Sequence, residues 1–155
     1  MVATGERQWT LEAMHLACAL ARNTGKDLVL VQMVSVSQPS YLGANFAHWN
    51  DTAEDQAHMR DYVHTAEDYG VNLSVTVFEY IDYVPGLVQA AEHVDAEFVF
   101  ATLPKSAIPY LRRLRLWNLR RELKPRTLYT LDPDTTMPEW KPTITVVTAQ
   151  KEVLR

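Results

Sequence analysis

The residues best suited to bind a charged ligand lie in one basic segment, ATLPKSAIPYLRRLRLWNLRREL, at residues 101 to 123. It follows the strand-like run 97 to 100, where an α/β domain commonly keeps a phosphate-binding loop. Such a loop usually needs glycine, because backbone N–H groups must approach the anion closely, and this segment contains none. Either arginines replace the backbone donors, or the segment no longer binds what its position suggests.

Charge is unevenly distributed along the chain. Eight basic residues oppose Glu122 alone within residues 101 to 126, a net charge of +7. Because the chain's formal charge is -4, the remaining residues together carry -11. An acidic body would repel a phosphate backbone beyond a local contact, so nucleic acid is not expected as a partner.

Other residues with chemical potential are scattered. His58 and His64 are six positions apart, with Asp55, Asp61 and Asp68 nearby, and a pair on one helical face would need a spacing of three or four. The sequence holds no Gly-x-Ser-x-Gly elbow, Walker loop, dinucleotide fingerprint or paired cysteine motif. We therefore expect no metal site, no catalytic residues and no enzyme, although dispersed residues could still assemble a site in the fold.

Three isolated residues, one cysteine and two histidines, have predicted structural roles. Cys18 has no partner for a disulfide and is predicted to be a small buried side chain rather than a reactive thiol. His15 is predicted to be partly buried and hydrogen-bonded, and His93 to close a helix, where a cation is favourable.

Length and composition indicate one globular domain. The chain has 155 residues, 47% apolar and 22% charged, which suits a single core. Its apolar runs are far shorter than the roughly 20 residues that span a bilayer, and Glu12 interrupts the one stretch that resembles a signal peptide. We expect a cytoplasmic protein without a membrane span.

Helical and strand patterns alternate along the chain. Apolar spacing predicts helices over 8–24, 51–69 and 84–94, the first ended by Gly25 and the second by Gly70. Strands are predicted over 28–35, 71–79 (at a sheet edge), 97–100, 127–131 and 143–149. Short connections then require parallel pairing with right-handed crossovers. The predicted fold class is α/β: a doubly wound, Rossmann-like, mostly parallel five-stranded sheet with helices on both faces, plus an extra C-terminal strand.

Some local details follow from the same patterns. Residues 1–4 would form a clipped first strand, and 143–149 could pair within the chain or across a dimer. Asn50 or Asp51 is the expected cap of the second helix, with Glu54 at capping-box distance. Its inner face should consist of Ala53, Ala57, Tyr62, Val63 and Ala66. The aromatic loop 37–50 could be a lid, a dimer contact or an ordinary packed loop.

Two long strings give the sequence a family resemblance. MVATGERQWTLEAMHLACALARNTGKDLVLVQMV resembles the opening of the universal stress protein family, and YGVNLSVTVFEYIDYVPGLVQAAEHVDAEFVFAT resembles its third strand, short helix and fourth strand. The resemblance covers residues 1–131 and implies that they form the α/β domain. Residues 132–155 are then a linker followed by a C-terminal strand or tail, which belongs to the same domain or to a dimer contact. It implies a homodimer formed through the last strand, and a transporter or another protein as a further partner.

The resemblance also implies a site from which this sequence departs. ATP-binding members have an aspartate after the first strand and a motif G-x-x-G-x9-G-(S/T) after the fourth. Here Thr4 or Gly5 stands at the aspartate's place, Ala101 and Thr102 open the motif region, and Trp117-Asn118 replaces its last Gly-Ser. Trp117 would fill the space that a phosphate needs. Alternatively, Leu116, Leu119 and Leu123 form one buried line of a helix that presents its arginines outward, and Trp117 packs beside that line or makes a dimer contact. The cleft residues carried over are Thr4, Gly5, Val34, Ala101, Thr102, Arg112, Arg113 and Asn118.

Three functions stay open at this point. The first is a non-enzymatic regulatory or stress-response module with degenerate nucleotide binding and no cofactor, ATP and AMP being disfavoured. The second is a sensor that binds a nucleotide or an anion through arginines such as Arg112, Arg113 and Arg115. The third is a weak nucleotide-hydrolysing enzyme on the same fold.

Overall fold

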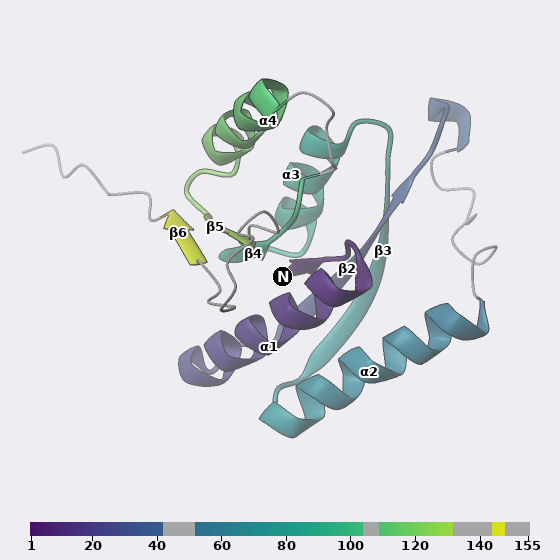
Figure 1. Cartoon of the computed structure of the whole chain (residues 1–155), viewed down its shortest axis with the longest axis vertical. Helices are drawn as coiled ribbons and strands as arrows, with labels where there is room; N and C mark the ends of the chain where they lie inside the picture. Colours follow the sequence, from purple (N-terminus) through teal and green to yellow (C-terminus); the bar gives the residue numbers. More distant parts are fainter. Residues whose placement is uncertain (42–51, 104–108, 132–143, 148–155) are drawn as a thin grey trace, which may run out of the picture.

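The computed structural model describes residues 1–41, 52–103, 109–131 and 144–147 (Figure 1). The strands are β1 (Val2–Ala3), β2 (Leu28–Ser35), β3 (Leu73–Tyr80), β4 (Phe98–Phe100), β5 (Thr127–Leu131) and β6 (Ile144–Val147). The helices are α1 (Arg7–Thr24), α2 (Ala53–Tyr69), α3 (Tyr83–His93) and α4 (Pro109–Glu122), with a short 3-10 turn at Pro39–Tyr41.

The strands form one sheet in the order β3-β2-β1-β4-β5-β6. The first four pairings in this order are parallel, while β6 is antiparallel to β5, with Leu131 opposite Ile144. The predicted doubly wound sheet with an added C-terminal strand is thus confirmed, and so are the shortness of the first strand and the edge position of the third. Because the chain first builds outward from β1 to β3 and then returns to β4, the order reverses between β1 and β4, where such folds bind ligands.

Two helices cover each face of the sheet, as Figure 1 shows. On one face, α1 and α2 bury residues such as Met14, Cys18 and Tyr62 against Val2 and Leu30. On the other, α3 and α4 bury Leu87, Leu119 and Leu123 against Val31, Val99 and Leu128. Alternate residues of the strands therefore feed two separate cores, which explains the nearly continuous apolar run of β2.

The predicted helix ends are largely confirmed. Gly25 and Gly70 both end their helices with a left-handed backbone, at φ 65° and 66°. The predicted cap of α2 was wrong: Thr52 is the N-cap, and Asp55, not Glu54, completes the capping box. Three successive residues at 50 to 52 can all cap a helix, so sequence could not choose among them.

The predicted inner face of α2 was correct only toward its end. Tyr62 and Ala66 are buried and Val63 half-buried, but Ala53 and Ala57 are exposed, and Thr65 is buried although it was not predicted to be. The beginning of the helix therefore contributes little to the core, and α2 depends on its capping box there.

The capping box makes a pH prediction. Hydrogen bonds from the Thr52 hydroxyl and backbone lower the pKa of Asp55, with a smaller contribution from His58. A lowered pKa stabilises the fold above the unfolded carboxyl pKa, and this stabilisation is lost as pH falls through the lower, folded value. We expect Asp55→Asn to lower the midpoint of urea unfolding at pH 7 and to flatten its decline below pH 4. Asp68→Asn, exposed on the same helix, should leave both unchanged.

The edge strand β3 carries an uncovered apolar surface. Val75 and Val77 point to the face covered elsewhere by α1 and α2, yet are 44% and 43% exposed.

Within the described ranges, no helix is long and apolar enough to cross a membrane. Most of loop 37–50, with the predicted aromatic contacts, lies outside the described residues, and the division into 1–131 and 132–155 stays a prediction.

Candidate functional site

The carboxyl ends of β1 and β4 bring four of the predicted cleft residues together. Thr4 and Gly5 follow β1, and Ala101 and Thr102 follow β4, its hydrogen-bonded neighbour. The two segments are in close contact: a Cβ on Gly5 would lie 2.7 Å from Cγ2 of Thr102. Gly5 is therefore required for the close approach of these two segments and does not leave open space for a phosphate.

The polar groups of the first segment are bound inside the chain. Thr4 donates its N–H to the carbonyl of Val31 at 2.9 Å, and its Oγ1 accepts from the N–H of Met33 at 3.3 Å. The N–H of Gly5 donates to Oγ1 of the fully buried Thr10 at 2.9 Å. A nucleotide would have to break these bonds, each worth about 0.5–1.5 kcal/mol, to use the same groups.

The second segment is held by a tyrosine from α3. The Tyr83 hydroxyl donates to the carbonyl of Thr102 at 2.6 Å. Burial raises the pKa of Tyr83 far above its ordinary value, and neighbouring Tyr80 raises it further, so the hydroxyl remains a donor throughout the physiological range. The hydrogen bond from Tyr83 fixes the backbone at Thr102. At this position a glycine motif would leave the backbone able to approach a phosphate closely.

A tryptophan from α1 closes the other side of Gly5. Atom Cε3 of Trp9 would lie 3.4 Å from a Cβ on Gly5, and its Nε1 donates to the carbonyl of Leu131 at 3.3 Å. Trp9 is only 8% exposed. Sequence reasoning missed both Trp9 and Tyr83. The available signal was their position in the first turn of the helices that leave β1 and β3.

The remaining predicted cleft residues are not brought to this site. Val34 is half-buried near the end of β2, opposite Glu79. Arg113 and Arg115 are exposed, Asn118 is half-buried on α4, and no described contact joins them to Gly5 or Thr102. The side chain of Arg112 lies outside the described part of the chain.

Trp117 was wrongly predicted to occupy the phosphate space. It is 57% exposed, and its ring stacks against the guanidinium of Arg121 at 5.3 Å. The reason is helical geometry: Leu119 and Leu123, both fully buried, turn their side of α4 to the core and leave Trp117 on the outer side.

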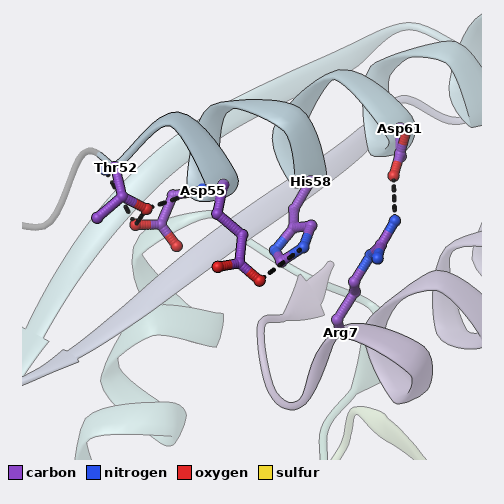
Figure 2. A network of polar contacts seen from close by, with 6 residues as sticks. Arg7, Thr52, Asp55, His58 and Asp61 are labelled. Carbon is purple, nitrogen blue, oxygen red and sulfur yellow. Dashed lines mark hydrogen bonds and ion pairs between the residues drawn. The ribbon is translucent and has the colours of Figure 1, made fainter.

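Several acidic and histidine residues of α2 pair with one another or with α1, and Figure 2 shows the contacts of His58 and Asp61. His58 lies 3.8 Å from Glu54, His64 lies 3.1 Å from Glu67, and Arg7 of α1 bonds Asp61 at 2.9 Å. Across the described ranges, no three His, Cys, Asp or Glu side chains could hold a metal ion together. These pairs are exposed and contribute little to stability individually.

The three isolated residues have ordinary roles. Cys18 is fully buried, as predicted, and burial raises its pKa to about 11, so the thiolate nucleophile is scarce at neutral pH. His93 ends α3 as predicted. His15 was predicted to be partly buried, but it is exposed and lies edge-on to Tyr69 at 5.9 Å, because α1 turns that position to solvent.

The fold is that of the universal stress proteins. A crystal structure described as a universal stress protein in complex with cAMP matches with a TM-score of 0.60 and 16% identity, covering 84% of this chain and 95% of that chain. A universal stress protein family member from Burkholderia pseudomallei matches with a TM-score of 0.57 and 19% identity, covering 84% and 93%. No protein-family model matches the sequence, and no curated protein matches it either. The predicted resemblance is confirmed at the level of the fold.

Proposed function

We propose that this chain is a divergent universal stress protein that acts as a non-enzymatic regulatory module, with a nucleotide cleft that has been lost to internal packing. One observation carries the proposal: the polar backbone and side-chain groups of Thr4, Gly5 and Thr102 that we describe at the switch point are hydrogen-bonded within the chain. A binding loop must instead keep free N–H groups that point at the anion.

The described arginines of α4 do not supply an anion-binding group to this site. Arg113 and Arg115 project from the exposed side of α4, where they are free to meet a partner but have no contact with Gly5 or Thr102. A cytoplasmic module of this kind would signal through contacts with other proteins, either a second copy of this chain or a larger assembly such as a transporter. The usual dimer through the last parallel strand is obstructed, since β6 occupies the open edge of β5.

A nucleotide-binding sensor is the second candidate, because one structural neighbour is a complex with cAMP. Calorimetric titration with ATP, AMP and cAMP separates the two. We expect no saturable heat at millimolar nucleotide and no phosphate release from ATP. The same titrations followed by amide NMR locate any binding: nucleotide-dependent shifts of Gly5 and Thr102 would contradict the proposal, and turnover of ATP would establish an enzyme.

A test of the cleft itself uses Tyr83→Phe. The change frees the Thr102 carbonyl without altering the ring, so we expect the free energy of unfolding to fall by about 1–3 kcal/mol, the cost of an unsatisfied buried acceptor, and nucleotide affinity to remain absent. Thermal and urea unfolding measure the first effect. Tyr69→Phe, for which no hydrogen bond of the hydroxyl is described, serves as the control and should change stability by less than about 0.5 kcal/mol.

A further inference from the structure

A cavity lies at the amino edge of the sheet, opposite the edge that carries Gly5 and Thr102. It measures about 400 Å³ and is bounded by the end of α1, the start of β2 and β4, and the residues just before β5. This volume lies in the range of small-molecule sites. The universal-stress-protein cleft at the carboxyl edge is formed by other residues, so this cavity is independent of the proposed function.

One wall of the cavity is apolar and aromatic. Its lining includes Ala17 and Leu20 of α1 and Phe98 and Phe100 of β4. The ring of Phe100 stacks on Tyr129 at 4.6 Å, with an interplanar angle of 10°, and Phe98 lies tilted against the same tyrosine at 6.2 Å. These contacts fix the rings in place, so the wall offers a rigid flat surface to an apolar ring.

The charged groups around the cavity are mostly occupied. Lys26 pairs with Glu97 and lies 6.0 Å from the centre of the Phe98 ring. One carboxylate oxygen of Asp27 accepts from the side-chain amide of Asn72 at 3.0 Å. Asp95 lines the cavity at the end of α3 and adds a negative charge there.

Arg126 supplies a positive charge to the cavity lining. Its Nε is buried, and no described group accepts a hydrogen bond from it. Arg120 Nε shares this condition, but only Arg126 lines the cavity. Buried donors almost always have a partner, and a guanidinium binds oxyanions through charge-assisted bonds. A guanidinium that lines a cavity beside a flat apolar wall is therefore the combination that recognises an oxyanion carried on a ring.

We propose that the amino-edge cavity binds a small organic anion, with its carboxylate or phosphate on Arg126 and its flat apolar body between Leu20 and Phe98. Asp95 disfavours ligands with more than one or two negative charges, and the paired Lys26 and Glu97 form a neutral rim. Such a ligand would stabilise the junction of α1, β4 and β5 by binding only the folded state.

The probe for this site is 8-anilinonaphthalene-1-sulfonate, a fluorescent dye with an apolar ring body and one sulfonate. We expect one dye per chain and amide NMR shifts at Lys26, Glu97 and Phe98, with none at Gly5 or Thr102. Arg126→Gln should weaken binding about tenfold, the effect of losing one charge-assisted bond. Arg121→Gln, an exposed arginine on α4, is the matched control and should bind as the wild type does.

Two further measurements make the result decisive. N-phenyl-1-naphthylamine, the uncharged counterpart of the dye, should bind wild type and Arg126→Gln equally, since it lacks the anion. Benzoate or phenyl phosphate should displace the dye, and the better competitor identifies the anion. The proposal is overturned if Arg126→Gln binds the dye as tightly as wild type, if the shifts lie elsewhere, or if neither competitor displaces it. NMR mapping on the unaltered chain guards against a variant that fails to fold.

Discussion

Leu119→Ala is expected to lower the free energy of unfolding by about 2–5 kcal/mol, whereas Leu114→Ala on the same helix should change it by less than about 0.5 kcal/mol. Leu119 is fully buried in the core between α3, α4 and the sheet, while Leu114 is 49% exposed. Truncating Leu119 leaves a cavity that the surrounding residues cannot fill. Truncating Leu114 removes apolar surface that is already half exposed to water, so it leaves no cavity. Urea unfolding of the two variants measures both values.

This pair of variants also tests the functional proposal, because it reports how α4 is rotated. The exposed side that carries Leu114 and Trp117 also carries Arg113 and Arg121. If Leu114→Ala proved as costly as Leu119→Ala, the helix would be turned differently and its arginines could reach the cleft. Equal losses would therefore favour the anion sensor over the regulatory module.

The elements of this fold were predictable because local signals agreed with the tertiary structure. The bounds of β2 and β5 match the predicted runs 28–35 and 127–131, and both predicted glycine caps end their helices. Apolar periodicity and glycine punctuation act over a few residues, so a single sequence contains them. Parallel pairing then followed from the short connections.

The candidate site was predictable only in part. The family resemblance placed Thr4 and Gly5 in one cleft with Ala101 and Thr102, and the structure brings them together because both pairs follow neighbouring parallel strands. The packing of Trp9 onto Gly5 depends instead on the angle at which α1 crosses the sheet, and the bond from Tyr83 depends on the position of α3. The spacing of residues along the sequence determines neither the crossing angle of α1 nor the position of α3.

The same limit explains the error on α2. This helix has more apolar residues than its buried face can hold, so periodicity predicts a stripe but does not say where the stripe ends. Ala53 and Ala57 were placed inside on that basis, but both are exposed. Trp117 was placed inside by the match to the family motif, and it is exposed as well. Burial of a large side chain requires a neighbour to cover it, and the beginning of α2 and the outer side of α4 have none among the described residues.

Gly86→Ala is the second large effect, and its sign runs against helix propensity. Alanine is the better helix former by about 1 kcal/mol, yet a Cβ on Gly86 would lie 2.5 Å from Cβ of Tyr80, an atom that no side-chain rotation can move away. Helix α3 must then shift off β3, so we expect a net loss of about 1–3 kcal/mol in urea unfolding. Gln89→Ala, exposed on the same helix, should be neutral or slightly stabilising. A Gly86→Ala protein as stable as wild type would mean that α3 does not approach β3 this closely, and the Tyr83 bond that closes the cleft would then lose its structural basis.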